Sequence, residues 1–325
     1  MHRRQFFGLL GGAALGLPKM AVAQGRVFRV GLLSPGPILT DNNPIAAGMI
    51  RGLAAHGYEP GKNVEFERRG ADGHLDRLPQ LVGELVANKV DVIATTGFPT
   101  ALAAKQATSL PIVAVNAGDP VGTGLINSLS HPDGNLTGIS DVSAEVTPKR
   151  LELLKQMAAN LRRVAVLWNA DDLGMTLRYR ASETGAQALG ISVQALGVRE
   201  PDDFNDAFVA MERDMPDAIL MVTDSLTLLN RKRIFDFAAA HRLPAIYEFG
   251  FLVHDGGLIS YGPDEGEMYG RWAALVARIL GGAKPPDLPF EEPTKFALFI
   301  NLKTAQALGL TPPPLFLAQA DEVIE

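Results

Sequence analysis

The stretch Pro111–Asp141, PIVAVNAGDPVGTGLINSLSHPDGNLTGISD, contains the features that decide the fold. It opens with an apolar run from Ile112 to Val115, which predicts a strand buried on both faces, as is typical of a parallel α/β sheet. A polar turn from Asn116 to Asp119 follows directly, and its residue types tolerate unusual backbone dihedral angles. Ligands of open parallel sheets bind outside the carboxyl ends of the strands, so we expect Asn116 and Asp119 to face a ligand.

The end of the same stretch predicts a passage between two lobes. Residues Gly134 to Gly138, GNLTG, form a short extended run between glycines, and we interpret it as the first crossover. The chain has 325 residues, of which 47% are hydrophobic and 20% charged, so it is long enough to bury two cores of ordinary size.

Strands and helices alternate on both sides of this crossover. Apolar runs of four to seven residues are followed by segments with helical spacing of apolar residues, such as Leu78, Leu81, Val82 and Leu85. This order predicts an α/β fold in which each of two lobes is a parallel sheet flanked by helices. We assign residues 26–139 plus about 263–290 to lobe 1, and residues 140–262 plus about 291–325 to lobe 2.

The first 23 residues have the pattern of an export signal. Arg3-Arg4 precede a weakly apolar segment of about a dozen residues, and Ala21-Val22-Ala23 fits a cleavage site. This pattern predicts a cleaved signal of the twin-arginine type and a periplasmic location. The alternative is an uncleaved, disordered tail or a weak anchor. The chain has no cysteine, so we expect no lipid anchor, disulfide or thiolate chemistry.

Charge and motifs exclude several classes of function. The formal net charge of −6 becomes −9 without residues 1–23, which argues against a nucleic-acid partner. The six histidines show no metal-ligand spacing, and no phosphate loop, dinucleotide fingerprint or nucleophile elbow is present. We therefore expect no catalytic residue, no metal and no cofactor.

The predicted strands end in six polar turns, each expected to precede a helix. Free backbone N–H groups at helix starts suit a carboxylate or another polar group of a ligand. The alternative is that these Ser, Thr and Asp side chains only cap helices. From the six turns we select as candidate ligand-binding residues Ser34, Thr95, Thr96, Gly97, Asn116, Asp119, Asn169, Thr223, Asp224 and Glu248.

Asp224 is the most specific of these candidates. It follows the apolar run Ala218 to Val222 and can accept hydrogen bonds from an amine or hydroxyl of a ligand, although it is equally suited to capping a helix. Aromatic residues at strand ends can form a wall for a planar ligand, or else pack in the core. The candidates for this wall are Trp168, Tyr247, Phe249 and Phe251.

The chain contains the motifs RRQFFGLLGGAA, GDPVGTGLINSL followed by GNLTGIS, HRLPAIYE, GGLISYGP, and the tail LPFEEPTKFALFINLKTAQALGLTPPPLFLAQADEVIE. These motifs resemble those of ABC transporter substrate-binding proteins of the tryptophan/tyrosine type. The likeness extends over essentially the whole chain. It implies the type I periplasmic binding fold, with three crossovers, and a protein that delivers a small solute to an inner-membrane ABC permease.

The resemblance also shows where this chain departs from its family. Members that hold aromatic amino acids usually have an Asn-Ser pair where this chain has Gly174 and Met175. Gly118 stands where the family often has Thr, whereas Asp119 and Asp224 are kept. These departures put an amino-acid ligand in question.

We therefore expect a monomeric, non-catalytic periplasmic protein that closes on a small polar or aromatic solute, an amino acid or related carboxylate among the candidates. Closure of two hinged lobes suits this task, because only a few residues change their dihedral angles. The alternatives are a module that presents the ligand to a signalling receptor and an exported enzyme built on the same scaffold.

Overall fold

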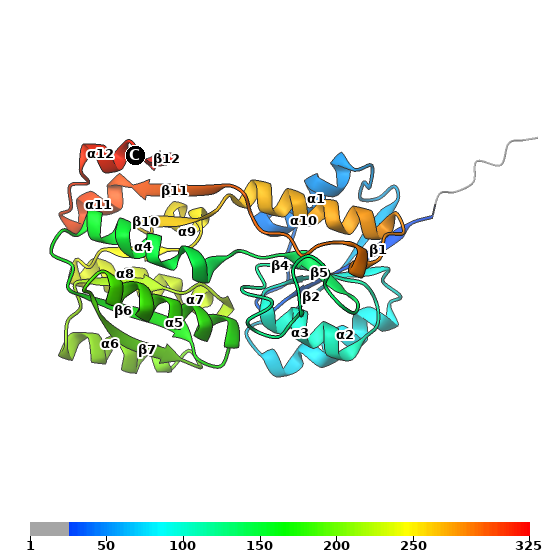
Figure 1. Cartoon of the computed structure of the whole chain (residues 1–325), viewed down its shortest axis with the longest axis horizontal. Helices are drawn as coiled ribbons and strands as arrows, with labels where there is room; N and C mark the ends of the chain where they lie inside the picture. The colour runs from blue at the N-terminus through cyan, green and yellow to red at the C-terminus, as the bar shows by residue number, and fades with distance from the viewer. Residues whose placement is uncertain (1–25) are drawn as a thin grey trace, which may run out of the picture.

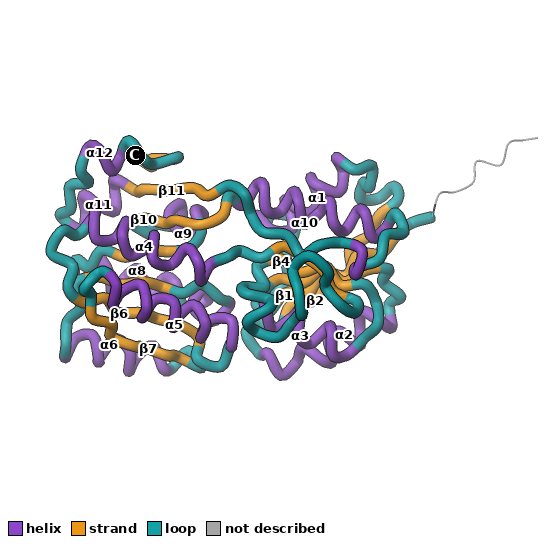
Figure 2. Tube along the Cα trace, in the orientation of Figure 1, coloured by secondary structure: helices purple, strands orange, loops and turns teal. Residues whose placement is uncertain are grey.

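The computed structural model describes residues 26–325, so the predicted export signal lies outside the described residues. The chain forms two lobes placed side by side along the long axis of the molecule (Figure 1). Lobe 1 is built on a five-stranded sheet and lobe 2 on a seven-stranded sheet. Helices flank both sheets, as the colouring by secondary structure shows (Figure 2).

The sheet of lobe 1 is parallel throughout, in the order β2-β1-β3-β4-β5. Apolar residues pack on both of its faces, and the inner strand β4 is a continuous hydrophobic run, whereas the edge strand β2 carries charged residues. The strands are β1 (Phe28–Ser34), β2 (Val64–Gly70), β3 (Val92–Thr96), β4 (Ile112–Val115) and β5 (Leu136–Ile139), and the helices α1 (Pro44–Ala55), α2 (Leu78–Ala87) and α3 (Phe98–Ala107), with a 3₁₀ turn η1 (Leu75–Arg77).

A late segment of the chain, α10 (Glu265–Leu280), returns to cover lobe 1. Its apolar side is buried, and the indole nitrogen of Trp272 donates a hydrogen bond to the carbonyl of Val113 in β4 at 2.9 Å. The Asp264 side chain caps the helix by accepting from the backbone N–H of Glu267. Residues more than 150 positions apart therefore share one core.

The sheet of lobe 2 has the order β12-β11-β10-β9-β8-β6-β7. Its strands are β6 (Arg163–Asn169), β7 (Ser192–Val198), β8 (Ala218–Met221), β9 (Ala245–Tyr247), β10 (Ile259–Pro263), β11 (Phe296–Asn301) and β12 (Glu322–Ile324). Its helices are α4 (Ser143–Met157), α5 (Leu173–Ala188), α6 (Asp203–Arg213), α7 (Ser225–Leu229), α8 (Arg231–His241), α9 (Gly250–His254), α11 (Leu302–Leu308) and α12 (Pro314–Leu317). A 3₁₀ turn η2 (Pro285–Asp287), which contacts β5 of lobe 1, precedes β11.

The prediction of two parallel sheets flanked by helices is confirmed, with one exception in lobe 2, where β10 and β11 are antiparallel. The chain passes between the sheets three times: after β5, after β10 and before β11. Strand β10 leads out of lobe 2 and β11 leads back into it. Two neighbouring strands with these roles must run in opposite directions.

The crossovers lie against one another rather than separately. The backbone of Ser140 donates to the carbonyl of Glu291 at 2.8 Å, and that of Asp264 donates to the carbonyl of Lys295 at 2.9 Å. In lobe 1, the carboxyl ends of the parallel strands β1, β3 and β4 point toward lobe 2, which places their following turns at the junction (Figure 1).

The backbones of β4 and β5 lie close together at Gly138 of β5. A Cβ atom at position 138 would lie 2.3 Å from the carbonyl oxygen of Ala114, and backbone atoms cannot yield as a flexible side chain does. We expect Gly138→Ala to lower the free energy of unfolding by about 1–3 kcal/mol, measured by urea denaturation.

Gly83 offers a matched control for this substitution. It is an exposed residue inside α2, and a Cβ atom there would meet nothing within 4 Å. Gly83→Ala should raise the free energy of unfolding by about 0.5–1 kcal/mol, because alanine restricts the unfolded chain. A Gly138→Ala protein as stable as the parent would contradict the close strand contact.

Candidate functional site

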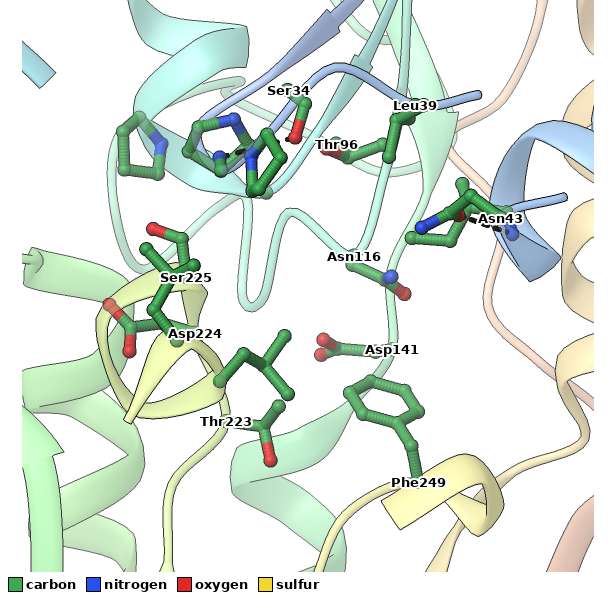
Figure 3. A pocket seen from close by; sticks show the side chains of 18 of the residues that line it. Ser34, Leu39, Asn43, Thr96, Asn116, Asp141, Thr223, Asp224, Ser225 and Phe249 are labelled. Carbon is green, nitrogen blue, oxygen red and sulfur yellow. Dashed lines mark hydrogen bonds between the residues drawn. The ribbon is translucent and has the colours of Figure 1, made fainter. Parts of the chain in front are cut away.

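A cavity of about 460 Å³ lies between the two lobes. Ser34, Thr96 and Asn116 reach it from the strand ends of lobe 1, whereas Thr223 and Asp224 reach it from the end of β8 in lobe 2 (Figure 3). Residues of the loop after β1, of the first crossover and of several helices, among them α5, α7, α9 and α10, also contribute to the lining. Both lobes therefore contribute to one site, which changes shape if the lobes move relative to each other.

Six of the ten candidate residues line this cavity, and four do not. The lining residues come from the ends of four strands, β1, β3, β4 and β8. They are Ser34, Thr96, Gly97, Asn116, Thr223 and Asp224. The other four, Thr95, Asp119, Asn169 and Glu248, are absent from the lining, and the geometry explains each case.

Thr95 and Asp119 are directed elsewhere by the backbone. Successive side chains of a strand point to opposite faces, so Thr95 is fully buried in lobe 1 while Thr96 faces the cavity. The carboxylate of Asp119 closes its own turn instead, since Oδ1 accepts from the backbone N–H groups of Val121 and Gly122 at 3.1 and 2.8 Å. The prediction that both residues face the ligand side is therefore wrong.

Asn169 and Glu248 lie behind the cavity wall. The Asn169 amide donates to Oδ2 of Asp224 at 2.7 Å, so Asn169 holds a lining residue without lining the cavity itself. Glu248 is 1% exposed and pairs with arginines. Neither side chain is placed for direct contact with a solute in the cavity.

The expectation that all six polar turns precede helices is also wrong for two of them. The turn at Ser34 leads into a loop that lasts until Asn43 caps α1, and the turn at Asn116 leads into the irregular segment 117–135. A helix dipole therefore contributes nothing directly at these two turns. The other four are followed by α3, α5, α7 and α9.

Asp224 is both a helix cap and a lining residue. Its Oδ1 accepts from the backbone N–H of Thr227 at 2.9 Å, and the Thr227 hydroxyl accepts from the backbone N–H of Asp224 at 3.0 Å, which forms a capping box at α7. Burial raises the pKa of Asp224 above its ordinary value in spite of these donors.

Two of the four aromatic residues that were candidates for a wall around a planar ligand line the cavity. Phe249 and Phe251 line the cavity, with their rings stacked at 6.0 Å between centroids. Tyr247 is 1% exposed and packs edge-on against Phe235, and Trp168 stacks on Tyr179 outside the cavity. The prediction is therefore wrong for Tyr247 and Trp168.

Two further apolar residues face the cavity although the sequence analysis did not select them. Phe98 is the first residue of α3, and Met175 lies in the first turn of α5. With the two phenylalanines of the second lobe they make much of the wall apolar. A solute with an aromatic or aliphatic body can be desolvated against such a surface.

A buried ion network that no sequence pattern predicted lies beside the cavity, and two of its members, Asp141 and Arg178, line it. Arg178 on α5 donates through Nη1 to Oε2 of Glu248 at 2.7 Å and through Nη2 to Oδ2 of Asp141. Arg150 on α4 lies 3.3 Å from Oε1 of Glu248, which also accepts from the Ser143 hydroxyl at 2.6 Å. We call these five residues the buried ion network.

The buried ion network is balanced in charge. Its two arginines and two carboxylates are each at most 2% exposed, so every charge depends on its partners for the stabilisation that water would otherwise supply. Asp141 belongs to the first crossover, while Ser143, Arg150, Arg178 and Glu248 belong to lobe 2. The network thus ties the crossover to the second lobe.

Gly118, one of the departures from the family pattern, stands beside this network. Its φ angle is +67°, and a Cβ atom there would lie 3.6 Å from Nη2 of Arg178. A β-branched residue such as threonine is strained in the left-handed region, whereas glycine is not. Glycine at 118 therefore lets the backbone turn next to the buried guanidinium.

Two more carboxylates line the cavity. Asp172 caps α5 and is 4% exposed, and burial, with a smaller contribution from the charge of Asp224, raises its pKa to about 6. Glu265 begins α10, and burial raises its pKa as well. Buried carboxylates are unusual in a largely apolar wall unless a cation or hydrogen-bond donors compensate their charge.

Three buried polar atoms of the lining have no hydrogen-bond partner: Oδ1 of Asn116, Oγ1 of Thr223 and Nε of Arg178. Asn116 has a φ angle of +56°, so its backbone is held in the left-handed region at the cavity. Buried polar atoms in folded proteins are normally satisfied. These three atoms are therefore available to a solute that enters from between the lobes.

The described residues hold no sign of a metal centre. Between residues 26 and 325, no group of three or more His, Asp or Glu side chains is arranged to hold a metal ion, and no described histidine lines the cavity. In the same part of the chain, none of the helices has the length and apolar character needed to span a membrane.

Comparisons with known proteins agree with this architecture. The chain is 25% identical over 264 residues to a tyrosine-binding protein of Clostridioides difficile, covering 81% of this chain and 76% of that protein. The structure resembles that of a conserved domain protein of Vibrio cholerae, with a TM-score of 0.86 and 27% identity over 92% of this chain and 100% of the other. It also resembles a Streptococcus pneumonia ABC domain in complex with L-Trp, with a TM-score of 0.84, 25% identity and the same coverage.

These neighbours establish a type I periplasmic-binding-protein-like fold of two lobes. A profile of the family described as ABC transporter substrate binding protein matches residues 41–324, which includes every element from α1 to β12. The chain belongs to the ABC transporter substrate binding protein family.

Proposed function

We propose that this protein is the periplasmic, non-catalytic receptor of an ABC importer, closing as a monomer over one small solute and presenting it to the permease. Membership of the family implies a small-molecule ligand and an ABC permease as partners. The observation that carries the proposal is the cavity between the lobes, where buried polar atoms from both lobes lack partners.

The lining supports a solute that combines a polar group with an apolar body. The polar contacts we assign to the solute are those of the lining candidates Ser34, Thr96, Gly97, Asn116, Thr223 and Asp224. Phe249, Phe251 and Met175 supply the apolar side. An aromatic amino acid or a related compound has this combination, and the named relatives include a tyrosine-binding protein and a domain in complex with L-Trp.

Solute binding should appear as ligand-dependent stability. A solute present at 100 times its dissociation constant adds about 2.7 kcal/mol to the free energy of unfolding, because it binds the folded chain alone. We expect at least one member of a library of amino acids, amines, carboxylates and sugars to raise the melting temperature, measured by thermal shift. A flat response to the whole library, together with no small molecule found by mass spectrometry of the purified protein, would contradict the proposal.

Thr223 allows a sharper test of the site. Its hydroxyl is buried and has no partner, so Thr223→Val removes no hydrogen bond from the empty protein and should leave its stability close to that of the parent. If the hydroxyl bonds the solute, the affinity of the best library solute should fall by about tenfold, measured by calorimetry.

Thr95→Val is the matched control for Thr223→Val. The Thr95 hydroxyl is also buried and without a partner, but it lies outside the lining. We expect this variant to bind the solute as tightly as the parent does. Equal losses in the two variants, or a loss confined to Thr95→Val, would show that the binding site is not the cavity described above.

A further inference from the structure

The cavity has more negative than positive charge in its lining. Five lining carboxylates face two lining guanidinium groups, those of Arg178 and Arg231. The ion pairs formed by these two arginines use Asp141, Glu248 and Asp255. Of the five lining carboxylates, those of Asp172, Asp224 and Glu265 form no ion pair with a described residue.

Both oxygens of Asp224 accept hydrogen bonds, but Asp172 and Glu265 are less well supplied with donors. Oδ1 of Asp172 receives both of its hydrogen bonds, from the backbone N–H groups of Gly174 and Met175 at 2.8 and 3.3 Å, which leaves Oδ2 free of any partner in the described chain. Glu265 accepts only long bonds, from Phe251 and Tyr269 at 3.4 and 3.3 Å. Burial outweighs these donors, since the pKa of all three carboxyl groups is raised.

Neither guanidinium group of the lining is free to form an ion pair with a carboxylate of the solute. Both terminal nitrogens of Arg178 are taken by Asp141 and Glu248, and only Nε–H remains. Arg231 donates to Asp255 at 2.8 Å and to the carbonyl of Leu228 at 2.9 Å. A buried carboxylate that brought its charge into this cavity would meet further carboxylates rather than a free cation.

The unused hydrogen-bonding capacity of the lining also favours a donor. Thr223 is 6% exposed, and the residue belongs to the same cavity wall as Asp224 (Figure 3). Its buried hydroxyl has no partner, and Oδ1 of Asn116 is a second unpartnered acceptor, contributed by the opposite lobe. An N–H-bearing group that reaches either atom would satisfy it.

From these contacts we propose that the solute is a net cation, in which an ammonium or amidinium group lies against Asp172 and Asp224 and an apolar body without a carboxylate lies against Phe249 and Met175. The proposal rests on the proposed function and specifies the charge of its solute. The cation relieves the repulsion between Asp172 and Asp224 and donates to Oδ2 of Asp172, which has no partner in the described chain.

Pairs of compounds that differ only in a carboxylate test this proposal. We would titrate the purified protein with tyramine and tyrosine, and with tryptamine and tryptophan, at neutral pH by calorimetry. The expected result is that at least one amine binds at least tenfold more tightly than its amino acid. An amino acid that binds as tightly as its amine, or more tightly, would overturn the proposal and leave the proposed function intact.

Two further outcomes of the library titration are also decisive. If neither pair binds, the net charge of the best-bound library solute decides: a cation supports the proposal, whereas a zwitterion, anion or neutral sugar overturns it. If no library solute binds at all, the proposed function itself fails. The two failures are thus distinguished by whether any solute binds.

Asp172→Asn removes the charge and keeps a side chain that can cap α5. We expect the affinity for the better-bound amine to fall at least tenfold, with a melting temperature no lower than that of the parent, because burial disfavours the charged form. Unchanged amine affinity would overturn the role of Asp172.

Asp217→Asn is the matched control. Asp217 lies at the opposite end of the lobe 2 sheet, and its Oδ2 likewise accepts two backbone N–H groups, those of Arg162 and Arg163 at 2.8 and 2.9 Å. It does not line the cavity. Amine affinity should be the same as in the parent, and an equal loss in both variants would show that the effect of Asp172→Asn is not specific.

Discussion

The pairing of Arg178 with Asp141 and Glu248 is the interaction on which the organisation of the site depends. A guanidinium group that is 2% exposed is tolerable only if carboxylates replace its water, and these two come from the first crossover and from the end of β9. The pairing therefore fixes where the crossover enters lobe 2. It also decides how the first turn of α5, with Asp172 and Met175, is presented to the cavity.

The same pairing determines the electrostatics of the cavity. Because Arg178 pairs with Asp141 and Glu248, it forms no ion pair with Asp172, Asp224 or Glu265, and its charge offsets only part of the effect of burial on the pKa of Asp172. Those carboxylates remain against a wall that is largely apolar, and burial raises the pKa of each. Fold and charge are thus connected: an interaction that stabilises the crossover leaves an acidic space between the lobes.

Much of the fold could be predicted because a strand that is buried on both faces has a continuous run of apolar residues in its sequence. Ile112–Val115 is such a strand, and the polar residues after it do stand at the lobe junction. The antiparallel pair β10–β11 could not be predicted in this way, because an apolar run does not show whether a strand is parallel or antiparallel to its neighbour. Within the site, Thr96 and Thr95 are chemically equal in the sequence, and only the pleat of β3 separates them.

The sequence by itself determined the order of strands and helices, and with it the gathering of strand ends where two lobes meet. The reason is that hydrophobic periodicity is a local property of the chain. Tertiary structure alone decided which charges are paired and which are left for a solute. Arg178 finds its partners 37 and 70 residues away, and no local pattern records a contact that exists only when distant segments pack together.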